Sequence, residues 1–133
     1  MNAQDLQPLL AQHPFSKDFR PQQIERLAAQ ARRATFEPEQ VVFRSGDDST
    51  DFYLIVSGRL ALEMAVGKKV LRIQTLSDGD EFGFSSLITG RPTTFQARAL
   101  QRIEALAFDG NRLLESCQAD PQFGFSLMRK LLL

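Results

Sequence analysis

The spacing of apolar residues changes from a helical pattern to an alternating one, and back again, along the chain. Over residues 4 to 34 the apolar positions recur at intervals of three and four, which predicts helices. Pro21 suits the first turn of the second helix, and Arg32 and Arg33 suit its carbonyl end, where cations stabilise the helix dipole. The two apolar stripes consist of Leu6, Leu9 and Leu10, and of Ile24, Leu27, Ala28 and Ala31. We therefore predict N-terminal helices within residues 1–35.

Residues 36–109 show short alternating stretches separated by turns, a pattern typical of strands. Turn residues cluster at 45–48, 57–58 and 77–80, and each cluster contains a glycine. The segment Val66-Gly67-Lys68-Lys69 is typical of the tip of a hairpin. Several short strands separated by glycine turns indicate an all-β roll or barrel. The predicted fold class is therefore mainly β with flanking helices: a β-roll (a double-stranded β-helix or jelly roll) with N-terminal helices and a C-terminal helix.

Helical spacing returns in residues 110–133. Asp120 and Pro121 mark the start of the last helix, since aspartate is a good cap and proline fits the first helical position. The apolar pattern runs to the last residue without a capping glycine, so we expect that the helix of a longer relative would continue. With no repeat and no linker, we predict one domain over residues 1–133.

The last helix is apolar over a wide arc. One face carries Phe123, Leu127 and Leu131, and the adjacent face carries Phe125, Met128 and Leu132. Such a helix either packs one face on the roll and the other on a partner, or is fully buried within the monomer, and both alternatives stay open. The first alternative predicts dimerisation through Phe125, Leu127, Met128 and Leu131.

Composition and charge exclude several classes of function. Because 16 basic and 16 acidic residues give zero net charge, no overall positive field attracts DNA or RNA, and we expect no nucleic-acid binding by this chain alone. One histidine and one cysteine cannot form a histidine- or cysteine-rich metal site, which argues against a metal-dependent cupin barrel. Cys117 has no partner for an internal disulfide, and no apolar stretch has the length of a membrane span. Since signal-peptide features are also missing, we expect a cytoplasmic protein that contacts no membrane.

The segment from Gly79 to Ala97 carries the candidate chemistry. A turn and Gly83 open what is predicted to be a single helical turn, whose free amides at Phe84, Ser85 and Ser86 would form an anion site. Arg91 adds a planar guanidinium suited to two phosphate oxygens. The hydroxyls of Ser85, Thr93 and Thr94 offer further donors. Together these groups could hold a singly charged phosphodiester; the alternative for Arg91 is an ion pair with Asp80, Glu81 or another carboxylate.

This segment resembles the phosphate-binding cassette of cyclic-nucleotide-binding domains, as in catabolite activator-type bacterial regulators and cyclic-nucleotide-dependent kinases. The resemblance extends from about Glu37 to the chain end and includes Phe82-Gly83, the Arg-x-x-Thr-x-x-Ala run from Arg91 to Ala97, and the glycines at 46, 58 and 79. It implies a β-roll that binds cyclic AMP or a related cyclic nucleotide and uses no cofactor. The cassette residues that it implies are Phe82, Gly83, Phe84, Ser85, Ser86, Arg91, Thr93 and Thr94.

Phe84 departs from this pattern. The family has glutamate there, and that glutamate accepts a hydrogen bond from the ribose 2′-hydroxyl. A phenyl ring accepts no ordinary hydrogen bond, and an unpaired buried hydroxyl costs about 1–3 kcal/mol. Either Phe84 fills a pocket that holds no nucleotide, or it selects another ligand. Pro92, where the family prefers a small residue, could fix the loop without preventing Arg91 from reaching a phosphate.

Two classes of function therefore remain. The first is a regulatory module that binds a small phosphate-bearing ligand and signals through its C-terminal helix to a second subunit or an appended output domain, which in relatives is often a helix-turn-helix DNA reader. The second is a degenerate roll that acts as a protein-interaction or dimerisation module. An enzyme is not expected, because no catalytic set assembles, Cys117 lies among apolar residues, and His13 has no evident catalytic partner.

Overall fold

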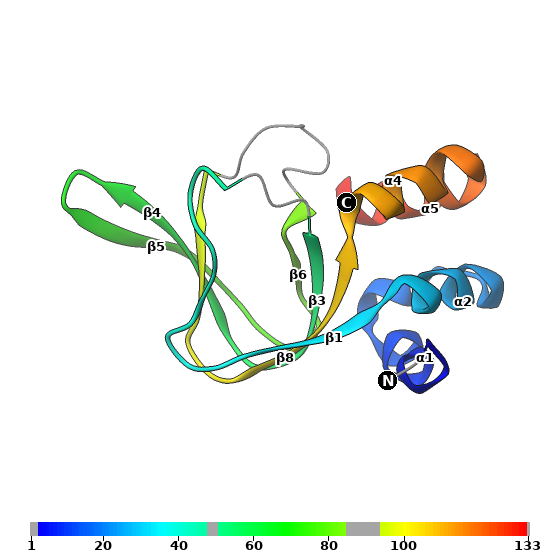
Figure 1. The fold of residues 1–133 in the computed structure, drawn as a ribbon, viewed down its shortest axis with the longest axis horizontal. Coiled ribbons are helices and arrows are strands. Elements are labelled where there is room, and N and C mark those ends of the chain that lie inside the picture. Colours follow the sequence, from blue (N-terminus) through cyan, green and yellow to red (C-terminus); the bar gives the residue numbers. More distant parts are fainter. Residues whose placement is uncertain (1–2, 48–50, 85–93, 133) are drawn as a thin grey trace.

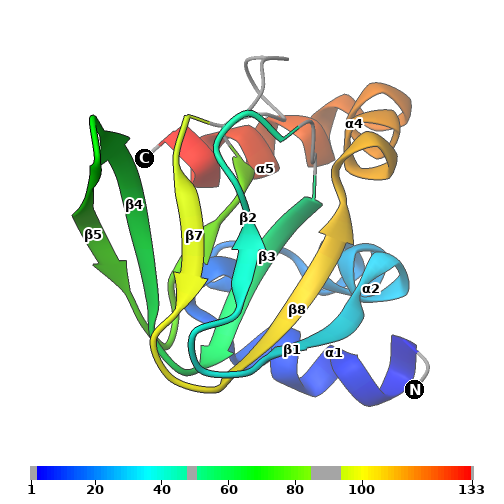
Figure 2. The ribbon, with the colours of Figure 1, turned by 60° about the vertical axis from the view of Figure 1, so that its left-hand side comes forward.

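The computed structural model describes residues 3–47, 51–84 and 94–132. Eight strands form two four-stranded antiparallel sheets, with the orders β1-β8-β3-β6 (sheet A) and β2-β7-β4-β5 (sheet B). The strands are β1 Arg32–Phe36, β2 Val41–Phe43, β3 Asp51–Ser57, β4 Leu60–Val66, β5 Lys69–Leu76, β6 Glu81–Phe82, β7 Gln96–Ala99 and β8 Ile103–Asp109. Figure 2 shows β3, β8 and β1 lying side by side next to the strands of sheet B. This arrangement confirms the predicted β-roll.

The helices gather on the outer side of sheet A, opposite sheet B (Figure 1). They are α1 Ala3–Gln12, the short 3₁₀ helix η1 Pro14–Ser16, α2 Pro21–Gln30, α4 Gly110–Ala119 and α5 Pro121–Leu132. Asp120 caps α5 as predicted, because its carboxylate accepts a hydrogen bond from the backbone N–H of Phe123 at 3.2 Å. The mainly β fold with flanking helices therefore agrees with the predicted class.

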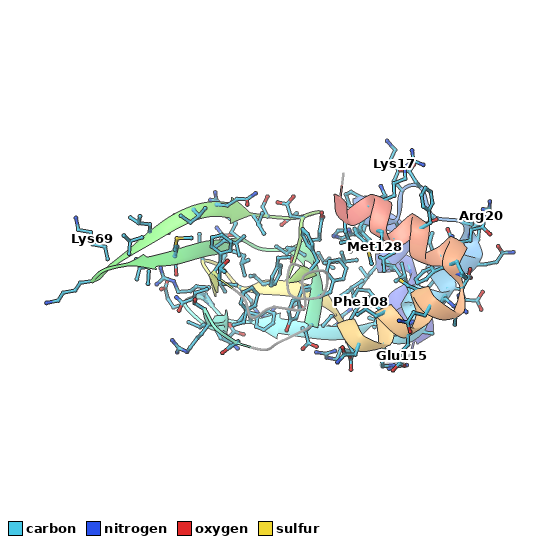
Figure 3. The ribbon with its side chains drawn as sticks, turned by 90° about the horizontal axis from the view of Figure 1, so that it is seen from above. Lys17, Arg20, Lys69, Phe108, Glu115 and Met128 are labelled. Carbon is cyan, nitrogen blue, oxygen red and sulfur yellow. The ribbon has the colours of Figure 1, made fainter. Side chains whose placement is uncertain are left out.

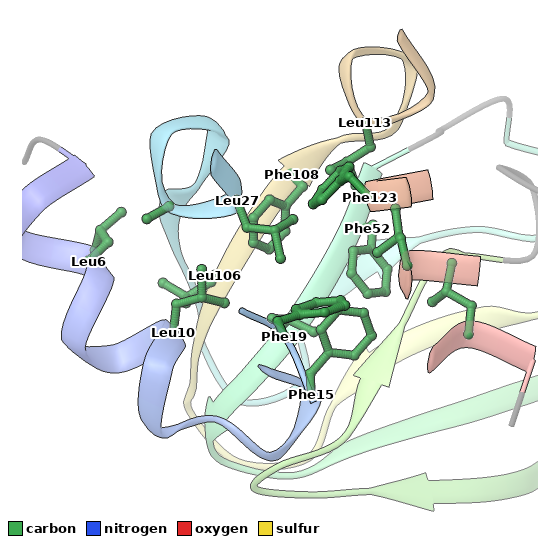
Figure 4. Packing of buried hydrophobic residues seen from close by; sticks show 14 residues of the cluster. Leu6, Leu10, Phe15, Phe19, Leu27, Phe52, Leu106, Phe108, Leu113 and Phe123 are labelled. Carbon is green, nitrogen blue, oxygen red and sulfur yellow. The ribbon is translucent and has the colours of Figure 1, made fainter. Parts of the chain in front are cut away.

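Sheet A separates two hydrophobic interiors, because alternate residues of a strand point to opposite faces. On β8, Leu106 faces the helices while its neighbour Ala105 faces sheet B. The helix-side core consists of Leu6, Leu10, Phe15, Phe19, Leu27, Ala28, Phe52, Leu54, Leu106, Phe108, Leu113, Phe123, Leu127 and Leu131 (Figure 4). The roll interior consists of Phe43, Tyr53, Ile55, Leu60, Leu76, Phe82, Ala97, Ala99, Ile103, Ala105 and Ala107.

Gly58 permits the tight connection between β3 and β4. Its φ is +119°, and a Cβ at this position would lie 2.5 Å from the backbone oxygen of Arg102. A side chain would therefore be strained and would collide with backbone. The predicted turn at 57–58 thus has a steric cause.

The hairpin of β4 and β5 extends beyond the rest of sheet B. Strand β4 pairs with β7 only from Leu60 to Glu63, so the remainder of the hairpin is a two-stranded ribbon with Lys69 near its far end (Figure 3). Four of the five large apolar side chains that are exposed in the described ranges lie here: Val66, Val70, Leu71 and Ile73. This ribbon contributes little to either interior.

The predicted helix end at Arg32 and Arg33 is wrong. These residues begin β1, which pairs with β8, while α2 ends at Gln30. Arg32 forms an ion pair with Asp51 of β3 at 2.9 Å, and Arg33 is exposed. Cations fit an exposed edge strand as well as a helix end, so the residue type could not decide between them.

The dimer contact predicted for Leu127 and Leu131 is also corrected. Their exposed fractions are 0% and 7%, because this face of α5 packs within the helix-side core of the same chain. Met128 packs partly against that core, whereas Phe125 is 67% exposed. Of the four residues predicted for dimerisation, Phe125 alone remains largely accessible.

Candidate ligand-binding site

The described part of the candidate cassette begins on the short strand β6. Its Phe82 pairs with Tyr53 of β3 and is buried in the roll interior. The rings of Phe82 and Tyr53 stack with centroids 4.7 Å apart, and Phe43 of β2 lies 6.2 Å from Phe82 on another side. This aromatic packing fixes the point at which the cassette leaves sheet A.

Gly83 is held in a conformation that other residues rarely adopt. Its φ is +93°, and a Cβ there would lie 2.5 Å from the backbone oxygen of Asp51. The lack of a side chain lets the chain pass close to β3 and turn immediately after Phe82. The Phe82-Gly83 pair, which carried part of the resemblance, therefore has a defined structural role.

Phe84 turns towards the helices. Its ring is partly buried and packs against the helix-side core, on the opposite side of sheet A from Phe82. Two residues separated by one glycine thus enter different interiors. At the position where the family has an acceptor for the ribose, this chain has a packing contact towards the helices.

The other cassette residues are only partly described. Ser85, Ser86, Arg91 and Thr93 lie outside the described residues, so their predicted roles stay predictions. Thr94 is exposed, and its backbone oxygen accepts a hydrogen bond from the Ser45 hydroxyl at 3.4 Å. Of the predicted cassette residues, the structure therefore describes Phe82, Gly83, Phe84 and Thr94, and it directs Phe82 and Phe84 into different interiors.

The carboxylates that precede the cassette differ in environment. Asp80 accepts a hydrogen bond from the backbone N–H of Ser77 at 2.8 Å, which closes the turn before β6. Glu81 is half-buried, and this burial, with the nearby Asp80 charge, raises its pKa.

Glu63 on β4 is a buried carboxylate whose burial and partners the sequence did not predict. The Glu63 side chain is 4% exposed and accepts hydrogen bonds from the Arg98 guanidinium and, at 3.1 Å, from the Gln96 amide. Arg98 also donates to Glu39 at 3.0 Å, and the Glu63 contact raises the pKa of Arg98. These contacts join β4 to β7, the strand that follows the cassette. A glutamate among apolar strand residues was the available signal, but only the strand register identifies its partners.

Cys117 and the possible metal ligands are the other groups considered in the sequence. Cys117 is half-buried, and burial raises the pKa of its thiol, so it is a poor nucleophile. Across residues 3–47, 51–84 and 94–132, no three histidine, cysteine, aspartate or glutamate side chains cluster as metal ligands would. No helix in these same ranges is long and apolar enough to cross a membrane.

The sequence matches the family described as "Cyclic nucleotide-binding domain" across residues 33–120. The chain belongs to this family. One curated relative, Acetyltransferase Pat from Mycolicibacterium smegmatis, is 35% identical over 85 residues. The match covers 64% of this chain and 26% of that protein, so the chain spans about a quarter of its relative.

Several solved structures share the fold. A Geobacter metallireducens protein, described as a cyclic nucleotide-binding protein, has a TM-score of 0.83 at 21% identity and covers 99% of this chain and 93% of its own. The sensor domain of the Pseudomonas aeruginosa transcriptional regulator DNR has a TM-score of 0.79 at 20% identity. The match covers 97% of this chain and 87% of that domain. The regulatory subunit of a cAMP-independent protein kinase A from Trypanosoma cruzi, solved bound to guanosine, has a TM-score of 0.77 at 15% identity. The match covers 92% of this chain and 47% of that subunit. Family and fold support a regulatory, ligand-sensing module.

Proposed function

We propose that this domain is a regulatory module that binds a cyclic nucleotide or a related phosphate-bearing ligand beside the end of β6. The observation that carries the proposal is the turn at Gly83, which sends Phe82 into the roll interior and Phe84 into the helix-side core. In this proposal, amides after Gly83 and the Arg91 guanidinium hold the phosphate. The cassette resemblance supports the role of Arg91.

The absence of glutamate at position 84 narrows the class of ligand. Phe84 has no carboxylate to accept a hydrogen bond from a ribose 2′-hydroxyl, so in this proposal binding does not require that hydroxyl. We therefore propose that the phosphate, and not the sugar hydroxyl, dominates recognition.

The signal would pass to α5 through Phe84. This ring packs against the core that contains Phe123 and Leu127 of α5. A ligand that favours one position of the cassette would thereby favour one position of the helix, which is the requirement for coupling. The receiver would be a second copy of the chain or an appended output domain.

Calorimetry on the purified protein tests the proposal. We expect cyclic AMP or cyclic GMP to bind with micromolar affinity. The affinity for 2′-deoxy-cyclic AMP should lie within about threefold of that for cyclic AMP, because position 84 has no carboxylate that accepts a hydrogen bond from the 2′-hydroxyl. Arg91→Ala should abolish this binding, whereas Arg112→Ala, at an exposed position on α4, should leave it unchanged.

If neither these ligands nor cyclic dinucleotides bind, the sensing proposal is contradicted. The exposed Phe125 favours the second candidate function, a protein-interaction or homodimerisation module. Sedimentation of the same samples separates the two: a concentration-dependent dimer that Phe125→Glu disrupts, without ligand binding, would support that module.

A further inference from the structure

His13 connects the N-terminal helices to the roll. The residue is 6% exposed and lies between α1 and η1. Its Nε2 lies 2.9 Å from the backbone oxygen of Ile55 on β3, and its Nδ1 accepts a hydrogen bond from the backbone N–H of Phe15 at 3.1 Å. Both ring nitrogens are therefore used.

These two partners define the protonation state of the ring. A backbone oxygen can only accept, so Nε2 must carry the proton, and a backbone N–H can only donate, so Nδ1 must be unprotonated. A second proton would lie on Nδ1 and point at the amide hydrogen of Phe15. Protonation would therefore break one hydrogen bond and leave a charge in a buried position.

Hydrogen bonds through Ile55 connect the His13 ring to the segment that leads into the cassette. The backbone oxygen of Ile55 that accepts a hydrogen bond from His13 also accepts one from the N–H of Gly79 at 3.0 Å. The N–H of Ile55 donates to the backbone oxygen of Asp80 at 2.8 Å. Pro14 lies against the same turn, since a Cβ at Gly79 would come within 3.2 Å of its ring. His13 and Pro14 thus pack on the turn at residues 77–80.

The residues that follow His13 enter the helix-side core. The ring of Phe15 lies 5.4 Å from that of Phe52 on β3, and 5.7 Å from that of Phe19, which in turn approaches Phe123 of α5. The position of η1 therefore affects the packing beneath α5. One histidine holds both this segment and the turn before β6.

The charged groups that face His13 are two aspartates of that turn. The Asp80 charge favours the protonated ring. Asp78 lines a cleft of about 290 Å³ together with His13, and its carboxylate accepts a hydrogen bond from the N–H of Gly58 at 2.8 Å. The other cleft residues, from α1 and β3, carry no titratable group; they are Leu9, Gln12 and Val56. Burial outweighs both the hydrogen bond to Ile55 and the Asp80 charge, so the pKa of His13 is lowered from its ordinary value.

We propose that His13 is a pH-sensitive contact: the neutral ring joins η1 to β3 and to the turn before the cassette. A proton on Nδ1 breaks the bond from Phe15 and places a charge in a buried position, which destabilises this contact although Nε2 still donates to Ile55. This inference does not depend on whether the domain binds a nucleotide. Since the pKa of His13 is lower in the folded chain than in the unfolded one, the contact stabilises the fold fully above about pH 6.5, the ordinary histidine value. That contribution is lost as the pH falls through the lower, folded-state value.

NMR titration of the wild-type chain is the first test, and it is unambiguous because the protein has one histidine. We expect the His13 ring to titrate below the midpoint measured in denaturant. The backbone amides of Phe15 and Gly79 should shift with the same midpoint, while the amide of Gly67, in the distant hairpin, should not. A ring that titrates at or above its unfolded midpoint, or amides that do not follow it, would overturn the proposal.

Thermal unfolding of His13→Gln is the second test. Glutamine offers a donor and an acceptor but does not titrate, and every other ionisable group is shared with the wild type. Between pH 7.5 and 5.0, the unfolding midpoint of the wild type should fall by about 4 °C more than that of the variant. Equal falls would overturn the proposal, and the wild-type titration decides the matter if the variant does not fold.

Discussion

The two interiors on either side of sheet A are built from different side chains. The helix-side core gains its volume from leucine and phenylalanine that both helices and strands contribute, and it contains a single alanine, Ala28. The roll interior comes from strands alone, and alanine supplies four of its eleven buried residues. Large residues that helices press against a sheet bury more apolar area, so we infer that the helix side supplies most of the stability. The roll interior instead shapes the surroundings of the cassette.

The largest expected effect is on the helix side. Leu106→Ala should reduce the free energy of unfolding by about 3 kcal/mol, because it leaves a cavity in the helix-side core. Chemical denaturation measures this loss. Leu71→Ala, the same substitution on the exposed ribbon, is the control and should change stability by less than about 0.5 kcal/mol. Equal losses in the two variants would contradict the proposed division between core and ribbon.

An intermediate effect is expected at the adjacent residue on β8, which faces the other way. Ala105→Leu should destabilise the protein by about 2 kcal/mol, because the added side chain overpacks the roll interior. Ala65→Leu, at an exposed position of β4, controls for the change in strand propensity. Stability unchanged from the wild type would mean that the roll interior accommodates a larger side chain, and the two interiors would then differ in free space as well as in composition.

The smallest effect concerns the residue that links the two regions. Phe84→Ala should cost about 1 kcal/mol, because the ring is only partly buried against the helix-side core. Combined with Ala105→Leu, its effect on the free energy of unfolding should add within about 0.5 kcal/mol, since the two side chains lie on opposite sides of sheet A. A coupling well above that value would place the Phe84 ring in the roll interior instead.

The sequence predicted the roll well because its turns depend on local chemistry. Gly58, Gly67 and Gly79 all have positive φ, which glycine tolerates, and these turns separate the strands as expected. The start of α5 was predicted correctly for the same reason, because the Asp120 cap and Pro121 act within the first turn of the helix. Arg32 and Arg33 were misassigned because an exposed cation suits either a helix end or an edge strand, and only the pairing with β8 decides.

The candidate site was less predictable because it depends on contacts between distant segments. Helical spacing placed Leu127 and Leu131 on one face, but spacing cannot say whether that face meets the same chain or another. His13 gave no signal, since its partner Ile55 lies 42 residues away and offers only a backbone oxygen. The identity of Phe84 was visible in the sequence, whereas the direction of its ring followed from the turn at Gly83.

Among the strands that the structure describes, β5 lies at an edge of sheet B, and we expect this edge to affect how the protein behaves at high concentration. An open strand edge that exposes Val70, Leu71 and Ile73 is a template for intermolecular sheet formation. Lys69 and Arg72 on the same strand make two such edges repel each other. Because salt screens this repulsion, we expect added salt to lower the solubility through these surface cations, although the net charge is zero.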